Sequence, residues 1–470
     1  MLATPARSAC RPQRTASHCP LAATSCASCV MARKPWRPAH GSTSGDPRMR
    51  TLRVRWWIYA YLFAFAAMAY VQRTTISVAA PELTATLQYT TQQIGWLFFA
   101  FTTAYALSQL PGGALGQRLG PRVMFTIVGI ISVVATLGTA LAPYVLGGAA
   151  LLTVLIIAQA LLGAGQGPVF PVLAVVLERW FPSRQFAMTN GVVSSGMLLG
   201  GALTPPLLVA LTATLGWQQA VLVTAIPAVV LTLGWWNYGR DRPEQHAGVT
   251  AAELAELDSP PPAPPLTFAR MGAVLSNRNI VLLAASYLCM NFVFYMISFW
   301  SFMYLVQERK LSGLESGLTA MVPWIGAAIG AAIGGVLADL LATRLGATRG
   351  YRLVPLLSLP AGALLLLAIP LLDSLVLAVA ALALAFFAME LNEGPYWAAT
   401  MNLARADTGA ATGVLNTGGN IGGMICQPVV AALVADGHWN DAWIAGAVFA
   451  AVAAALWAVV RCERPASAEP

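Results

Sequence analysis

Hydrophobic positions in this chain form long stretches that polar segments separate. From Trp56 to Ala69 the sequence reads WWIYAYLFAFAAMA, without a charged side chain. A helix needs about 20 mostly apolar residues to cross a bilayer, whereas a membrane β-barrel shows alternating segments of about ten residues, which are absent here. The pattern predicts twelve membrane-spanning helices, at 56–80, 92–115, 123–142, 149–177, 187–213, 217–238, 279–306, 314–338, 353–372, 375–401, 409–435 and 440–460.

Composition and charge placement agree with a membrane protein. Hydrophobic residues make up 57% of the chain and charged residues 10%, against about 25% charged residues in globular proteins. The net charge of +8 does not indicate nucleic acid binding, because the bases recur in every second connection. The connections on the opposite side of the membrane contain only two basic residues, Arg309 and Lys310. By the positive-inside rule we expect both termini in the cytoplasm of a bacterium, with the chain in the inner membrane.

The first 50 residues predict neither a signal peptide nor a domain, because they contain no apolar core of suitable length and no periodicity. Four of the seven cysteines lie in the first 30 residues. No second pair or histidine cluster completes a metal or redox site there, so we expect none. We interpret 1–50 as a disordered extension, with Met31 and Met49 as alternative translation starts.

A proline-rich polar segment at 239–278 separates two predicted six-helix halves, 51–238 and 279–462. We interpret it as a cytoplasmic linker, in which VTAAELAEL predicts a short surface helix. Residues 463–470 form a cytoplasmic tail.

The two halves repeat each other. GVVSSGMLLGG at 191–201 matches GVLNTGGNIGG at 413–423 with all four glycines in step, GGALGQ at 112–117 matches GGVLAD at 334–339, and QGP at 166–168 answers EGP at 393–395. The glycines are interpreted as packing residues that let helices approach closely. Duplication of six helices places binding sites near the midplane, between the repeats.

Five motifs then carry a family resemblance. They are YVQRTTISVAAP at 70–81, QLPGGALGQRLGPR at 109–122, GAGQGPVFP at 163–171, RDRPEQHAGVTAAEL at 240–254 and GVLNTGGNIGG. In this order they resemble the major facilitator superfamily and, within it, the anion:cation symporter family of sugar-acid and other organic-anion permeases, over about 51–462. The resemblance implies an all-α fold of twelve membrane helices in two halves. It also implies that helices 1, 4, 7 and 10 line a cavity that opens alternately to each side.

Arg73 is the only basic residue inside a predicted span. An arginine at the centre of a membrane helix costs about 2.5–3.5 kcal/mol on insertion scales, so something must compensate it. The resemblance places Arg73 in the cavity, where its planar guanidinium suits a carboxylate. We therefore expect it to bind the substrate anion. The alternative is a permanent ion pair with Glu390 or Glu393.

Further polar residues are candidate contacts for the substrate. On the seventh helix Tyr287, Asn291 and Tyr295 are four residues apart and share a face, as do Asn416 and Asn420 on the eleventh. Unpaired amides are costly in hydrocarbon, whereas aromatic stripes more often pack. The predicted substrate-binding set is Arg73, Tyr70, Gln166, Tyr287, Asn291, Tyr295, Asn416 and Asn420.

The family carries acids in the first half where this chain has Gln72 and Gln166, neither of which can take up a proton. Glu390 and Glu393, three residues apart, are the only carboxylates well inside the predicted spans; Glu315 and Asp441 stand at the second position of theirs. Two such groups in a low-dielectric cavity should not both ionise, so we predict that proton coupling has moved to them. Sodium coupling, and uniport or exchange without an ion, remain the alternatives.

At the predicted cytoplasmic gate, Gln117 stands where the family has an acid, before Arg118 and Arg122. Asp339 keeps the acid in the second half. An acid at this position would stabilise one conformation of the transporter by pairing with basic groups or with a helix N-terminus. Because only the second half has the acid, we expect this stabilisation to differ between the two halves.

No enzyme constellation is present: the four histidines lie outside the spans and no nucleotide-binding loop occurs. We expect no cofactor and no metal. The expected function is secondary active transport of a small organic anion by a monomer in the lipid bilayer. Alternatives are an uncoupled or exchange-type anion transporter, an organophosphate exchanger and a transporter-like sensor. Helix 7 offers no second buried cation for a doubly charged phosphate ester, which favours a carboxylate.

Overall fold

The computed structural model describes residues 53–181, 186–257, 268–404 and 408–462. The predicted extension 1–50 and tail 463–470 lie outside these ranges. Each predicted span coincides with one helix or with two consecutive helices. The first half contains α1 (Val54–Leu87), α2 (Thr91–Leu119), α3 (Pro121–Leu141), α4 (Gly148–Gln166), α5 (Val169–Trp180), α6 (Phe186–Leu215), α7 (Trp217–Val223) and α8 (Ala225–Tyr238).

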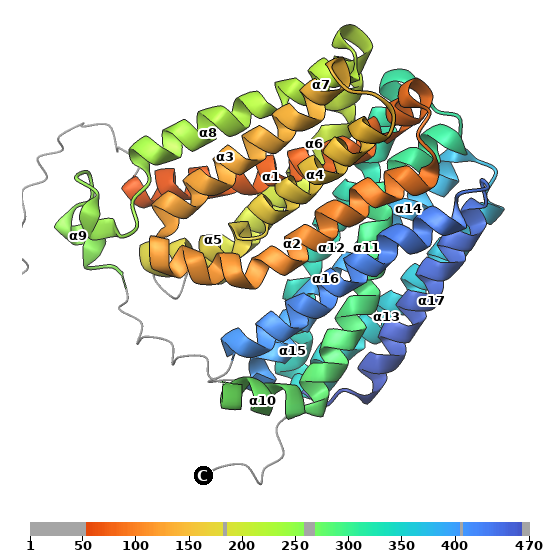
Figure 1. Ribbon diagram of the computed structural model, residues 1–470. Coiled ribbons are helices and arrows are strands. Elements are labelled where there is room, and N and C mark those ends of the chain that lie inside the picture. Colours follow the sequence, from red (N-terminus) through yellow and green to blue (C-terminus); the bar gives the residue numbers. More distant parts are fainter. Residues whose placement is uncertain (1–52, 182–185, 258–267, 405–407, 463–470) are drawn as a thin grey trace, which may run out of the picture. The chain divides into compact units, whose positions relative to one another are not determined.

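The second half contains α11 (Arg278–Gln307), α12 (Gly313–Leu345), α13 (Ala347–Ala368), α14 (Leu375–Glu390), α15 (Glu393–Ala404), α16 (Thr408–Leu433) and α17 (Trp439–Val459). Short helices α9 (Ala251–Leu254) and α10 (Phe268–Ser276) lie between the halves in the sequence (Figure 1). The predicted surface helix in VTAAELAEL is α9, whereas α10 was not predicted. It lies in the segment that was interpreted as linker.

Ten helices of the described residues are long and apolar enough to cross a membrane. The two predicted spans outside this set are α2 and α16, which carry glutamines, asparagines and several glycines. These two helices pack against each other across the two halves, so close that a Cβ on Gly95 of α2 would lie 2.4 Å from the Cβ of Ala431 on α16. Their polar side chains are therefore sheltered from lipid by the opposite half.

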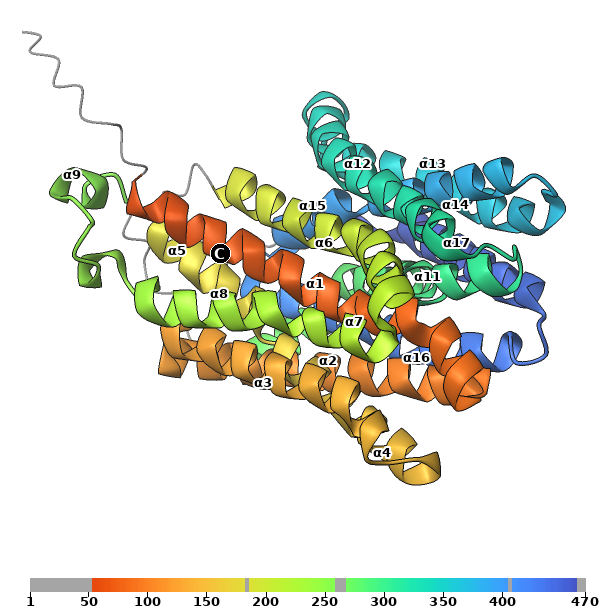
Figure 2. The ribbon, with the colours of Figure 1, turned by 90° about the horizontal axis from the view of Figure 1, so that it is seen from above.

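The repeated glycines lie where helices pack closely against each other, as the sequence predicts. A Cβ on Gly200 of α6 would lie 2.3 Å from the backbone oxygen of Ala67, and one on Gly422 of α16 would lie 2.1 Å from that of Leu288. These are the equivalent contacts α6–α1 and α16–α11. Any side chain at either glycine would push the two helices apart. The second view shows α1 lying between α6 and α8 (Figure 2).

Two spans are interrupted, the fourth within the QGP motif and the tenth just before the EGP motif. The fourth breaks between α4 and α5 at residues 167–168, and the tenth between α14 and α15 at 391–392. Pro168 and Pro395 have no backbone N–H, so each removes one helical hydrogen bond. In the second break, the side-chain amide of Asn392 donates to the backbone oxygens of Ala388 and Met389 at 2.8 and 3.0 Å.

Hydrogen bonds connect the described part of the linker to the first half. The Asp241 carboxylate accepts a hydrogen bond from the backbone N–H of Arg122 at 2.8 Å, at the start of α3. Gly120, with φ of +86°, permits this approach, because a Cβ there would lie 2.5 Å from the carboxylate. Glu256 accepts from Arg55 at 2.7 Å. Hydrogen bonds from Arg53 and Arg55 hold the pKa of Glu256 below its usual value.

Candidate functional site

Arg73 lies deep in α1, with 4% of its surface exposed. Three aromatic rings surround the guanidinium. Its central carbon is 4.4 Å from the ring centroid of Tyr105, 4.5 Å from that of Tyr70 and 5.1 Å from that of Phe101. Cation–π attraction of this kind offsets part of the cost of removing the charge from water.

The guanidinium nevertheless lacks an anionic partner. Its Nε and Nη2 atoms are buried without a hydrogen-bond partner. In the part of the chain that the structure describes, ion pairs join only Arg53 and Arg55 to Glu253 and Glu256. The alternative of a permanent Arg73 ion pair with Glu390 or Glu393 is therefore not seen in this conformation. Buried polar groups in proteins are nearly always hydrogen-bonded, so two unpaired donors on a buried charge indicate a binding site for an acceptor.

Several residues around Arg73 were missed by the sequence reasoning. Phe101 and Tyr105 come from α2, and Trp324 of α12 packs edge-on against Tyr70 with ring centroids 6.1 Å apart. Tyr295 on α11, which was predicted, also interacts electrostatically with the arginine. The site thus lies between the two halves. Phe101 and Tyr105 are four residues apart on one face of α2, but such a pair in an apolar run looks like ordinary packing.

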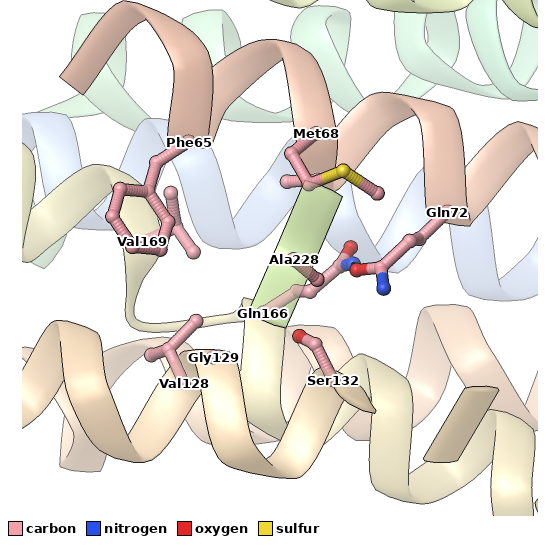
Figure 3. Close-up of a pocket in the computed structure, with 10 residues that line it drawn as sticks. Phe65, Met68, Gln72, Val128, Gly129, Ser132, Gln166, Val169 and Ala228 are labelled. Atoms are coloured by element: carbon pink, nitrogen blue, oxygen red, sulfur yellow. The ribbon is translucent and has the colours of Figure 1, made fainter. Parts of the chain in front are cut away.

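The predicted contact Gln166 does not reach Arg73 but belongs to a polar chain inside the first half. Its amide nitrogen donates to the side-chain oxygen of Gln72 at 3.2 Å, and the Gln72 amide donates to Thr136 at 3.1 Å. The two amides point toward each other beside a narrow pocket that Met68 and Ser132 also line (Figure 3). The two glutamines that replace the family's acids are therefore joined by one hydrogen bond, and Oε1 of Gln166 stays buried without a partner.

Asn416 and Asn420 of α16 bind a residue of the opposite half. Both side-chain amides donate to Oε1 of Gln109 on α2, each at 2.7 Å. Gln109 is buried and was not predicted, because a single glutamine near the end of a span gives no sequence signal of its partner. We call these three residues the amide clasp. Because the clasp joins the halves, alternating access requires it to break.

We predict that Gln109→Leu destabilises this conformation, because it leaves the amides of buried Asn420 and partly buried Asn416 without their acceptor. Each hydrogen bond contributes about 0.5–1.5 kcal/mol. Spin labels at exposed Glu178 of α5 and Met401 of α15 should then show a second distance population. Gln109→Glu keeps the acceptor and should behave as wild type, as should Thr417→Ala, which removes a neighbouring exposed side chain. An unchanged distance distribution in Gln109→Leu would show that the clasp is energetically neutral.

In the second half, Glu393 at the start of α15 accepts several hydrogen bonds. The Tyr287 hydroxyl lies 2.9 and 3.1 Å from its two oxygens, and the Trp397 indole N–H donates at 2.7 Å. The Asn291 amide donates to the backbone oxygen of Tyr287 at 3.0 Å. Glu390, the last residue of α14, is buried three residues before Glu393. The structure therefore brings the predicted carboxylate Glu393 together with the predicted Tyr287.

The predicted gate residues do not form one cluster. Arg122 donates its Nε and Nη2 to the backbone oxygen of Trp236 at 3.0 and 2.7 Å and stacks on that indole. Arg118 and Asp339 are exposed, and the side chain of Gln117 is not among those described. The acid at the start of α3 is Asp241 of the linker, which the gate prediction did not include.

Comparison with known proteins assigns this chain to a family. The sequence profile of the Major Facilitator Superfamily matches residues 62–426. A probable sulfoacetate transporter of Cupriavidus necator is 30% identical over 81% of this chain and 87% of its own. A hexuronate transporter of Bacillus subtilis is 26% identical over 88% and 96%. A probable galactarate/D-glucarate transporter of Escherichia coli is 27% identical over 84% and 91%.

Solved structures show the same fold. A bacterial homologue of the human lysosomal transporter Spinster, in an inward-facing and unoccupied conformation, aligns with a TM-score of 0.68 and 16% identity, covering 87% of this chain and 97% of its own. Apolar helices of spanning length and two repeated six-helix halves agree with that match. The chain is a multi-pass membrane protein with the major facilitator fold, and it belongs to the Major Facilitator Superfamily.

Proposed function

We propose that this protein transports a small organic anion across the membrane by alternating access, and that Arg73 binds the anionic group of the substrate. One observation carries the proposal: the Arg73 guanidinium is buried between the halves, with Nε and Nη2 unpaired and without a carboxylate partner in the described chain. A carboxylate or sulfonate that accepts both donors would complete the site. Its release would follow separation of the residues that the two halves contribute.

The relatives support an organic anion as substrate, since their names specify sulfoacetate, hexuronate and galactarate or D-glucarate. Four of the polar residues predicted to contact the substrate donate a hydrogen bond to another side chain of the protein. The side-chain amides of Asn416 and Asn420 donate to Gln109. The Tyr287 hydroxyl donates to Glu393, and the Gln166 amide donates to Gln72. The rings around Arg73 offer mostly apolar surface. These features favour a compact anion over a polyhydroxylated one.

An organophosphate remains the weaker alternative. A doubly charged phosphate group favours a second buried cation near the first. The other buried arginine of the described residues, Arg55, lies at the start of α1 and is paired with Glu256. Arg73 therefore faces the substrate with a single positive charge, which suits a monoanionic carboxylate or sulfonate.

We further propose that uptake is coupled to a cation, with a proton as the first candidate. Glu390 is buried and Glu393 is partly buried, three residues apart on either side of the break in the tenth span, and two carboxylates placed in this way in a low-dielectric site tend to share one proton. In this proposal the linker and both termini face the cytoplasm of a bacterial cell, and the protein acts as a monomer.

The proposal is tested by thermal unfolding of the purified protein with a panel of anions, followed by uptake into proteoliposomes. We expect a raised unfolding midpoint with sulfoacetate or another compact carboxylate, a smaller rise with glucarate and hexuronate, and none with a glycerol phosphate. Binding without uptake would instead support a sensor. If the largest rise comes from the phosphate ester, the charge argument is wrong; if no organic anion binds, so is the proposed function.

A further inference from the structure

A second basic site lies far from Arg73, where three helix ends of the second half meet. The pocket is lined by Arg278 and Asn279 at the start of α11, Arg352 in α13, and Ala458, Val459 and Arg461 at the end of α17. Its volume is about 550 Å³, within the roughly 300–1,000 Å³ of ligand sites in general. The three guanidinium groups make it strongly positive.

No acid of the described residues lines the pocket to balance these charges. The lining contains three arginines and an asparagine but no aspartate or glutamate. None of the three arginines forms an ion pair with a described carboxylate, since those ion pairs involve only Arg53 and Arg55. The α11 N-terminus adds partial positive charge at Arg278. Three like charges at one pocket repel one another unless an anion lies between them.

The pocket is also held in shape. The Arg352 Nε donates to the backbone oxygen of Trp457 at 3.2 Å, near the end of α17. The side-chain oxygen of Asn279 accepts from the backbone N–H of Arg461 at 2.9 Å. These two bonds connect α13 to α17 and α11 to the segment after α17. Arg278 and Arg461 keep their guanidinium groups exposed at the pocket.

The same two helices carry exposed apolar side chains. On α13, Leu357 and Leu364 are 65% and 68% exposed, and on α17, Val452 and Val459 are 44% and 52% exposed. In a membrane protein such surfaces contact acyl chains. A ligand that combines a phosphate with hydrocarbon would use both features, whereas a soluble anion would use only the arginines.

We propose that this pocket binds the phosphate headgroup of an anionic phospholipid, with its acyl chains along α13 and α17. Guanidinium groups bind phosphate through parallel charge-assisted hydrogen bonds. Basic pockets between membrane helices bind such headgroups in general. The site is independent of Arg73 and of the identity of the transported anion.

The test compares Arg278→Gln/Arg461→Gln with a control that removes equal charge from the same half, Arg344→Gln/Arg349→Gln. All four side chains are exposed, and Arg352 is left intact because it supports α17. The full-length proteins are delipidated, mixed with phosphatidylglycerol or phosphatidylcholine, and examined by native mass spectrometry. Each arginine near an anionic lipid contributes roughly a fivefold gain, so the test variant should bind phosphatidylglycerol about thirtyfold more weakly than wild type and control.

Thermal unfolding distinguishes the source of the phosphate. We expect phosphatidylglycerol, but not inorganic phosphate, to raise the unfolding midpoint of wild type and control. Equal phosphatidylglycerol binding by the test variant would overturn the site. An equal rise with inorganic phosphate would overturn the lipid assignment. If the double variant does not fold, Arg278→Gln and Arg461→Gln are measured singly, with the same outcomes each expected at about fivefold.

Discussion

Arg73→Lys is expected to weaken binding of the transported anion about ten- to a hundredfold while the protein stays folded. The structure leaves two donors of this side chain, Nε and Nη2, unpaired in a buried site. A bidentate acceptor can use both, whereas lysine offers one ammonium without the planar fork. A hydrogen bond to a charged group contributes about 1.5–3 kcal/mol, so losing one costs about ten- to a hundredfold in affinity. Titration calorimetry with the best anion of the panel measures this loss.

The control for this prediction makes the same substitution at an arginine outside the site. Arg309→Lys removes a guanidinium that donates to the Tyr304 hydroxyl at 2.7 Å and to the backbone oxygen of Ile369 at 3.0 Å. It should reduce stability without changing anion affinity. Arg73→Lys should show the reverse. If Arg73→Lys binds the anion within a few-fold of wild type, Arg73 is a structural residue that its aromatic cage satisfies.

The helices and the central arginine are predictable from the sequence because each depends on local features. Runs of apolar residues determine the spans, and a single charge in such a run stands out whatever surrounds it. The glycines of 191–201 and 413–423 predict close packing because their spacing is read within one helix. The breaks next to Pro168 and Pro395 likewise follow from the missing backbone donor.

The rest of the site depends on which helices meet, and the sequence does not show that. Asn416 and Asn420 were expected to contact substrate, but in the structure both bind Gln109, about three hundred positions earlier in the chain. The ring of Tyr105 over Arg73 is a contact between α1 and α2. Polar residues at helical spacing thus show which face is polar, whereas the partner of that face comes only from tertiary packing.

The carboxylates of the tenth span show both what the sequence predicts and what only tertiary structure reveals. Their spacing of three residues predicts neighbours on one helix, yet the helix breaks between them, so that Glu390 ends α14 and Glu393 begins α15. Glu393 then receives hydrogen bonds from Tyr287 and Trp397, which stabilise its charge. Glu390 is buried, and no described side chain donates a hydrogen bond to it. Within the pair, we therefore expect Glu390 to carry the proton when one is shared.

The second large effect is expected in coupling. Wild-type protein in proteoliposomes should concentrate the anion when an inward proton gradient is imposed. Glu390→Gln and Glu393→Gln should both lose this accumulation, because a glutamine cannot exchange the proton. Both should still exchange labelled for unlabelled anion, since Arg73 is intact. A glutamine at 393 still offers an oxygen to Tyr287 and Trp397, so the fold around it should survive.

The matched control is Glu308→Gln, which removes a carboxylate that is exposed at the end of α11 and should leave gradient-driven uptake unchanged. If Glu393→Gln and Glu390→Gln still concentrate the anion with a proton gradient, the proton site has not moved to the tenth span. A wild type that ignores the proton gradient but responds to a sodium gradient would assign the same carboxylates to sodium. Indifference to both gradients would make the protein a uniporter or an exchanger.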